Sequence, residues 1–94
     1  MPAYMIFTRE KVIDQAELDT YSKEVMPTLA SHPVKILAYG AHQTLEGTPT
    51  GGTAILEFPD TASAMAWYDG PEYRKVREHR FRGGKYTAIL IEGR

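Results

Sequence analysis

The chain of 94 residues contains no cysteine, so disulfides and thiolate metal ligands are excluded. No apolar run approaches the roughly 18 residues that a membrane-spanning helix needs. The first residues, 1–4, lack the basic flank and the apolar core of a secretory signal. We therefore expect a protein of a reducing compartment, by default the cytoplasm, without a membrane partner.

Neither sign of charge dominates, because 11 lysines and arginines stand against 12 acidic residues and the formal net charge is −1. This balance argues against a protein that binds nucleic acids. Apolar residues make up 43% and charged residues 24% of the chain, as in globular proteins. We expect one domain over residues 1–94, and a core this small would gain stability from a partner chain.

Strand and helix patterns follow one another in the order β-α-β-β-α-β, with an extra short helix before the last strand. Asp14, followed three residues later by Glu17, forms a capping box with Asp in place of Ser or Thr. Pro27 predicts a kink or restart of this helix near residues 25–26. Strands are predicted over 3–8, 34–39, 53–58 and 86–91. Helices are predicted after the caps Asp14 and Asp60, and a third helix is predicted to begin at Pro71.

Two glycine positions predict changes of direction between these elements. Gly40 predicts a bulge in the second strand, which we expect to continue over residues 42–45. Gly83 and Gly84 predict a turn or hinge between the last helix and the last strand.

This element order is the split βαβ, or ferredoxin-like, arrangement of the α+β class. Right-handed crossovers place the first and third strands in the middle of a four-stranded antiparallel sheet, with helices on one face. The strands contain consecutive apolar residues, at 5–7, 54–56 and 89–91, so both faces of the sheet are apolar. We therefore predict a homodimer in which the uncovered faces of two sheets pack together.

Several short motifs resemble one known family over essentially the whole chain. These motifs are Met1-Pro2-Ala3-Tyr4, Leu45-Glu46-Gly47, Leu56-Glu57-Phe58-Pro59 and, above all, Ala66-Trp67-Tyr68-Asp69-Gly70-Pro71-Glu72-Tyr73. They resemble the domain of unknown function number 1330, a family of the dimeric α+β-barrel superfamily. The resemblance implies the same fold and dimer but no established activity. The superfamily includes cofactor-free monooxygenases, lactone isomerases, haem-binding enzymes and ligand-sensing domains, and fold alone does not choose among them.

Aromatic side chains are predicted to line a cleft between the helices and the sheet. Tyrosine and tryptophan combine an apolar body with a hydrogen-bonding tip, which suits a site for a small ring or carbonyl compound. The alternative is that these aromatics only fill the core of a small domain, and this applies most to Trp67. The predicted substrate-binding residues are Tyr4, Tyr21, Trp67, Tyr68 and Tyr73.

Three polar residues are the catalytic candidates: Glu57, His79 and Arg80. Glu57 would be a general base if its strand face meets the helices, and a salt bridge or plain exposure is the alternative. Arg80 would bind a carboxylate or carbonyl oxygen, unless it belongs to a solvated helix face. His79 would move a proton or, by analogy with superfamily members, be an axial haem ligand; a surface position is the alternative.

No cofactor or metal is predicted, because the three histidines lack ligand spacing. The leading hypothesis is a small-molecule-binding dimer, in its sharper form a cofactor-independent enzyme of monooxygenase or isomerase type. A non-catalytic sensor or scaffold module and a haem- or metal-dependent relative are the alternatives. The basic helix over residues 71–82 carries no groove-reading motif, which adds to the case against nucleic-acid binding.

Overall fold

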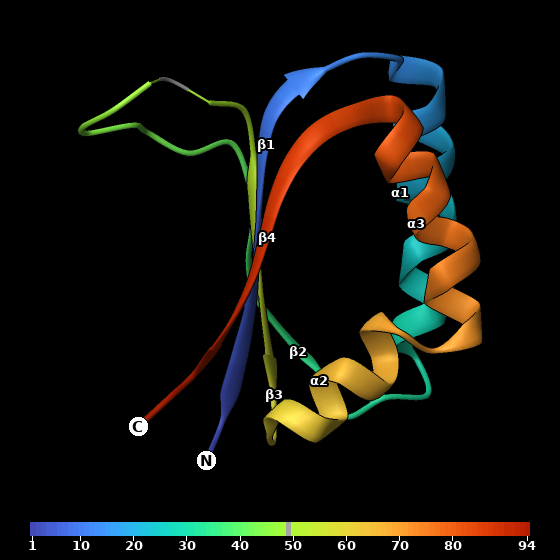
Figure 1. Ribbon diagram of the computed structural model, residues 1–94, viewed down its shortest axis with the longest axis vertical. Helices are drawn as coiled ribbons and strands as arrows, with labels where there is room; N and C mark the ends of the chain where they lie inside the picture. The colour runs from blue at the N-terminus through green and yellow to red at the C-terminus, as the bar shows by residue number, and fades with distance from the viewer. Residues whose placement is uncertain (49) are drawn as a thin grey trace.

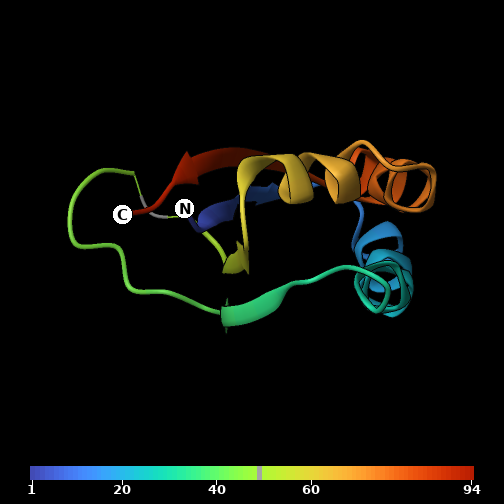
Figure 2. The same ribbon diagram turned by 90° about the horizontal axis from the view of Figure 1, so that it is seen from below.

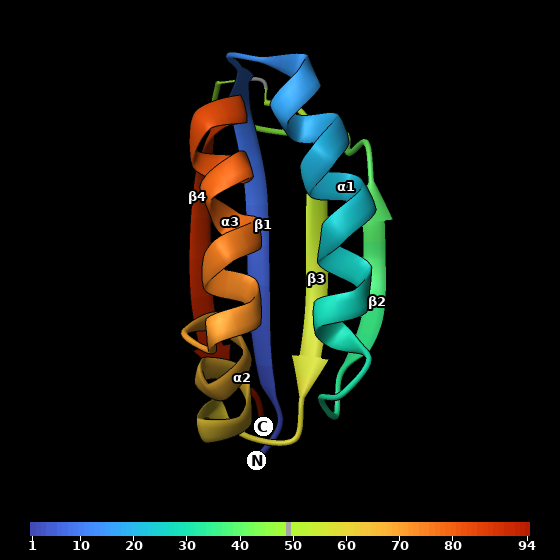
Figure 3. The ribbon, with the colours of Figure 1, turned by 90° about the vertical axis from the view of Figure 1, so that its right-hand side faces the viewer.

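The computed structural model describes residues 1–48 and 50–94 and shows an antiparallel sheet with helices on one side (Figure 1). All the helices together form the second layer (Figure 3). The elements are β1 (Ala3–Val12), α1 (Gln15–Leu29), β2 (Lys35–Gly40), β3 (Thr53–Phe58), α2 (Thr61–Tyr68), α3 (Pro71–Gly83) and β4 (Gly84–Glu92).

The four strands lie in the order β2-β3-β1-β4, and every neighbouring pair is antiparallel. The prediction that the first and third strands occupy the middle is therefore confirmed. The α1 helix lies over the β3–β2 half of the sheet and α3 over the β1–β4 half (Figure 3). Residues 41–48 extend from the sheet on the side opposite the helices (Figures 1 and 2).

Both faces of the sheet carry apolar side chains, as the consecutive apolar residues predicted. Met5 lies opposite Leu56 across the β1–β3 ladder, and both are buried on the face that the helices cover. Ile6 lies opposite Ile55 on β3 and opposite Ile89 on β4, on the other face. No element of this chain covers that second face among the described residues, and Ile89 is 48% exposed.

The core between the layers is built around Trp67, which is 1% exposed. Its ring stacks on the ring of Tyr73 at a centroid distance of 4.0 Å. Phe58 and Phe7 lie within 5.8 and 6.3 Å of the same ring. The indole Nε1 donates a hydrogen bond to Thr28 Oγ1 at 3.0 Å, which satisfies its only polar group.

The N-caps at Asp14 and Asp60 are present, but the capping box and Pro27 differ from our expectation. The Asp14 N–H donates to Gly83 O at 2.9 Å, and the Glu17 carboxylate accepts from His79 instead. The Asp14 side chain accepts from the backbone N–H of Ala16, and the Asp60 side chain accepts from that of Ser63. The α1 helix runs through Pro27 without a restart and ends two residues later, at Leu29. The predicted restart is wrong because Pro27 lies in the last turn, where little helix remains to be interrupted.

The expectations for the glycines also need correction. The bulge in β2 falls between Ile36 and Ala38, and Gly40, with φ +142°, ends the strand. The predicted extension over 42–45 is absent. Gly83 is not a turn residue, because it is the last residue of α3 and β4 begins at the next position.

Candidate functional site

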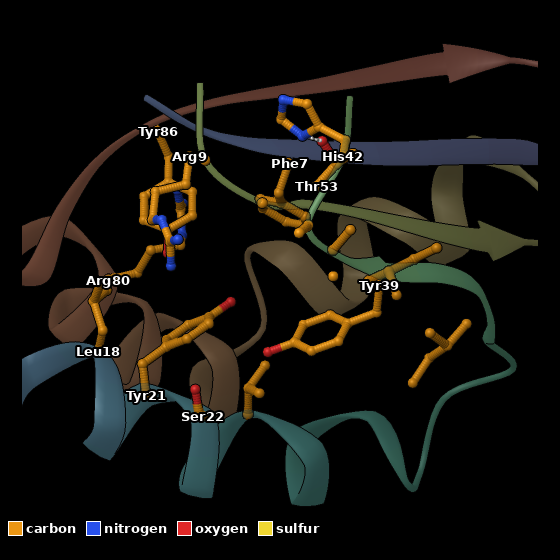
Figure 4. A pocket seen from close by; sticks show the side chains of 18 of the residues that line it. Phe7, Arg9, Leu18, Tyr21, Ser22, Tyr39, His42, Thr53, Arg80 and Tyr86 are labelled. Atoms are coloured by element: carbon orange, nitrogen blue, oxygen red, sulfur yellow. Dashed lines mark hydrogen bonds between the residues drawn. The ribbon is translucent and has the colours of Figure 1, made fainter. Parts of the chain in front are cut away.

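A cavity of about 360 Å³ lies between α1 and the covered face of the sheet. Phe7 and Leu56 line it from the sheet, Leu18 and Tyr21 from α1, and Arg80 from α3. Its volume falls in the range of small-molecule sites. Figure 4 shows Arg9, Arg80 and Tyr86 gathered at one end of this cavity, with Tyr39 at a distance from them.

Arg80 is a buried cation in the wall of the cavity. Its side chain is 3% exposed, and its Nε atom has no hydrogen-bond partner among the described residues. The guanidinium lies 5.1, 4.9 and 5.2 Å from the ring centroids of Phe7, Phe81 and Tyr86. Each cation–π contact contributes about 0.5–2 kcal/mol, whereas burial of an ion costs several kcal/mol. The aromatic faces offset part of the cost of burying Arg80, but they supply no hydrogen-bond acceptor for its Nε atom.

Two tyrosines from different helices meet at the wall of the cavity. The hydroxyl groups of Tyr21 and Tyr73 are 2.6 Å apart. Tyr21 lines the cavity, and Tyr73, which is fully buried, lies behind it. Burial raises the pKa of both phenols, while the nearby Arg80 charge opposes the rise. Both are therefore neutral groups that can donate a hydrogen bond.

Arg9 brings a second guanidinium to the cavity from β1. Its backbone pairs with the chain that enters β3: Arg9 N donates to Gly52 O at 2.9 Å, and Gly51 N donates to Arg9 O at 2.7 Å. A Cβ atom on Gly51 would lie 2.7 Å from Arg9 Nε. The absence of a side chain at Gly51 therefore leaves room for the Arg9 guanidinium beside Tyr86. Burial raises the pKa of Tyr86, and the positive charge of Arg9 lowers it.

His42 is the only histidine in the lining of the cavity, as far as the structure describes the chain. Its Nε2 lies 2.8 Å from Thr50 Oγ1 and its Nδ1 lies 2.6 Å from Thr53 Oγ1. Because a threonine hydroxyl can donate or accept, both neutral tautomers satisfy both contacts. His42 thus connects the chain after β2 with the start of β3.

The predicted aromatic residues divide into three groups. Tyr21 and Trp67 line the cavity, and Tyr73 supports Tyr21 from behind. Tyr68 lies outside the lining and faces Arg77, whose guanidinium is 4.7 Å from its ring. Tyr4 lies on the uncovered face of the sheet, so its predicted place in the cleft is wrong.

Of the polar candidates, only Arg80 reaches the cavity. Glu57 lies opposite Tyr4 on β1 and Lys35 on β2, on the uncovered face, because its neighbours Leu56 and Phe58 point toward the helices. Its expected place in the cleft is wrong, since alternation along β3 sends every second side chain to the other side.

His79 is also placed differently from our expectation. It lies outside the cavity lining, where its Nδ1 donates to Glu17 Oε2 at 2.7 Å and its Nε2 is 3.5 Å from Glu24 Oε2. These contacts connect α3 to the outer side of α1. Among residues 1–48 and 50–94, no group of three or more acidic or histidine side chains has an arrangement that could hold a metal ion.

The lining of the cavity includes four side chains that the sequence pattern did not indicate: Arg9, Tyr39, His42 and Tyr86. Alternation offered one signal, since Arg9 is two residues after the core residue Phe7 and therefore shares its face. Tyr86 lies opposite Arg9 in the β1–β4 ladder, which no local pattern reveals. The sequence pattern placed His42 in a continuation of the second strand, but β2 ends at Gly40.

Comparisons with known proteins agree on the fold. A protein of unknown function from Rhodopseudomonas palustris superposes with a TM-score of 0.78 at 17% identity, covering 99% of this chain and 82% of that one. Dimeric ferredoxin-like proteins of unknown function from Jannaschia and Thermobifida fusca give 0.76 at 12% and 0.73 at 13%. Those two alignments cover 99% of this chain, and 100% and 92% of the others. At these identities the likeness shows the fold alone.

No curated protein matches the sequence of this chain. The described helices include none that is both long and apolar enough to cross a membrane. The family model described as a domain of unknown function (DUF1330) matches residues 2–94, nearly the whole length, as the motifs around Trp67 predicted. This chain therefore belongs to the DUF1330 family.

Proposed function

We propose that this protein binds a small organic molecule in the cavity between α1 and the sheet, with Arg80 contacting an oxygen atom of that molecule. The observation that carries the proposal is the burial of Arg80 beside an open cavity without an acidic partner in the described chain. A guanidinium does not lose its proton in a protein, so it cannot escape the cost of burial by becoming neutral. A bound carboxylate or carbonyl would place a negative oxygen atom beside the guanidinium and offset the cost of its burial.

The proposal is for binding, without a reaction assigned. Two of the three residues that the sequence suggested for catalysis, Glu57 and His79, lie outside the cavity lining. Arg80 remains as a ligand-contacting residue, and Tyr21 offers a neutral donor beside it. These groups suit the orientation of a ligand, and a sensor of small molecules needs nothing more.

A ligand screen tests this proposal directly. Small carboxylates, carbonyl compounds and phenols would be added to the protein while its melting temperature and the emission of Trp67, the single tryptophan, are recorded. We expect a subset of compounds to raise the melting temperature, because binding to the folded state alone stabilises it. Arg80→Met should remove this response, and Arg74→Met, at an exposed position of the same helix, should keep it. A screen in which no compound shifts either signal would contradict the proposal.

We also propose that two copies pack through the uncovered face of the sheet. Ile6, Ile55, Ile89 and Ile91 share this face by register, and similar solved structures are described as dimeric. Ile91 is 52% exposed in the single chain, and a second sheet would remove this apolar surface from water. A chain without cysteine fits the reducing cytoplasm as the compartment of such a dimer.

Analytical ultracentrifugation of matched variants tests the dimer. Ile89→Glu places a charge on the uncovered face and should produce monomers. Ala62→Glu makes the same kind of change at an exposed position of α2, in the helical layer, and should leave the dimer intact. A stable monomer of the unmodified protein at micromolar concentration would rule this assembly out.

A further inference from the structure

The cavity is positively charged even though the chain as a whole is slightly negative. Two guanidinium groups, from Arg9 on β1 and Arg80 on α3, contribute to its lining. Within the described part of the chain, no aspartate or glutamate lines it. The formal net charge of the protein is −1, so this local excess of positive charge is a property of the site rather than of the composition.

The cavity also changes in polarity along its length. Arg9 lies opposite Tyr86 at one level of the sheet, close to Gly51. Leu56 and Ile36 line the cavity at the level of Met5, four residues away along β1. At about 3.3 Å per residue, this separates the two levels by roughly 13 Å.

The side chains at the second level are apolar. Leu56 from β3 and Ile36 from β2 line the cavity here, and Ile36 is 45% exposed. Leu29 of α1 and Trp67, both buried, also line the cavity. An anionic group has favourable partners only near the arginines, and a hydrocarbon group has favourable surroundings only at the other end. The cavity is therefore complementary to a molecule with two unlike ends.

We infer that the ligand is an amphiphilic organic acid, and this inference rests on the proposed binding function. Its oxyanion lies between Arg80 and Arg9, where two guanidinium groups compensate its charge. Its apolar chain or ring extends along Phe7 toward Leu29 and Leu56. The hydroxyl of Tyr21, on the wall between these ends, donates to an oxygen atom of the head group.

The first experiment compares ligands of similar chain length that differ in their head groups. Binding of octanoate, octyl sulfate, octyl phosphate and the neutral octanamide would be measured by calorimetry. We expect at least one of the acids to bind about tenfold or more tightly than the amide, because the neutral amide cannot form charge-assisted hydrogen bonds between an anion and the buried guanidinium. The order among the three acids identifies the preferred head group.

Variants at both arginines locate the head group. Arg80→Met and Arg9→Met should each reduce the advantage of the acid over the amide, and Arg74→Met should not. Circular dichroism would confirm that each variant is folded, and Arg80→Gln provides a second change at the buried position. An advantage of the acid that is unchanged in folded variants at both arginines would overturn the assignment of the head-group site.

Ligand length and orientation are tested separately. Octanoate should bind more tightly than butanoate, by about fourfold for each additional buried methylene. Bromine quenches tryptophan emission at short range, so 8-bromooctanoate should quench Trp67 more than 2-bromooctanoate does. Stronger quenching by the 2-bromo acid would overturn the orientation.

The two proposals fail in different ways. If octanamide or the neutral compounds of the broader screen bind as tightly as the acids, the inference that the ligand is an amphiphilic acid is wrong, and the proposed binding function stands. If neither acids nor neutral compounds bind, the binding function fails as well.

Discussion

The hydroxyl groups of Tyr21 and Tyr73 lie 2.6 Å apart and connect α1 to α3 across 52 residues of sequence. Their rings meet edge to face at a centroid distance of 6.2 Å. The two helices cover different halves of the sheet, so this contact fixes their spacing above the cavity. It also directs the Tyr21 side chain into the wall that a ligand would touch.

Removing one hydroxyl should have unequal effects on the two sides of this pair. Tyr21→Phe leaves the fully buried Tyr73 hydroxyl without its partner and should lower the free energy of unfolding by about 1–3 kcal/mol. Tyr73→Phe should cost less, because the Tyr21 hydroxyl faces a cavity that water can enter. Urea unfolding of both variants measures the difference.

The double variant and a control complete this test. Tyr21→Phe combined with Tyr73→Phe should cost no more than Tyr21→Phe alone, because the two changes remove the same hydrogen bond. Tyr39→Phe, at a side chain that is 78% exposed, should stay within about 0.5 kcal/mol of the unmodified protein. Additive costs in the double variant would show that the two hydroxyls do not stabilise one another.

Stability should fall in alkaline solution because of buried tyrosines. Burial raises the pKa of Tyr21, Tyr73 and Tyr86 above the ordinary value of 10.0. As the pH rises, these tyrosines therefore ionise in the unfolded chain before they ionise in the folded protein. The stabilisation that depends on the neutral phenols is complete below pH 10.0 and is lost as the pH rises toward the folded-state pKa values. Absorbance of tyrosinate near 295 nm should show a late group of tyrosines that ionise only with unfolding. Ionisation of all six tyrosines in one early step would contradict this.

Arg80→Met should separate stability from binding. A methionine of similar length would remove a buried charge that the ligand-free protein compensates incompletely. Replacement of buried ionic groups by apolar side chains is often neutral or stabilising by about 1–4 kcal/mol. We therefore expect an unchanged or higher melting temperature without ligand, together with loss of the ligand response. A lower melting temperature would show that the contacts with aromatic rings already compensate the guanidinium.

Alanine at two glycines should distinguish a flexible neighbour from a rigid one. In Gly51→Ala the new Cβ meets the Arg9 guanidinium at 2.7 Å, and that side chain can move. In Gly83→Ala it meets Leu18 Cδ2 at 2.6 Å and the Leu18 backbone N at 3.0 Å. We expect a cost of about 1–3 kcal/mol for Gly83→Ala and less for Gly51→Ala, measured by urea unfolding. Binding of octanoate should weaken in Gly51→Ala, because Arg9 is displaced.

Acid should release the contact between α1 and α3 at Glu17. The hydrogen bond from His79 is the largest cause of the lowered pKa of Glu17, whose ordinary value is 4.5. The contribution of the carboxylate is present above pH 4.5 and is lost as the pH falls through the lower folded-state value. The melting temperatures of the unmodified protein and Glu17→Gln should therefore differ above pH 4.5 and converge below it. Glu24→Gln, whose carboxylate is farther from His79, should show a smaller difference. Equal melting temperatures at every pH would contradict this.

The sequence was sufficient for features that depend on a few neighbouring residues. Asp14 and Asp60 begin helices because their side chains accept from backbone N–H groups within the next three residues. The apolar runs in the strands indicated a sheet with two apolar faces. The motif around Trp67 indicated the family.

The tertiary structure alone decided which polar residues meet. Glu57 lies in a strand that is apolar on both faces, so the local pattern gave no reason to prefer one side for its carboxylate. The register with β1 and β2 placed Glu57 on the side away from the helices. Arg9, Tyr21 and Arg80 come from β1, α1 and α3, and they approach one another only because the helices pack on a sheet of defined register. Successive side chains of a strand point to opposite faces of the sheet, whatever strand it pairs with. Which distant side chains meet, in contrast, depends on the packing of the whole chain.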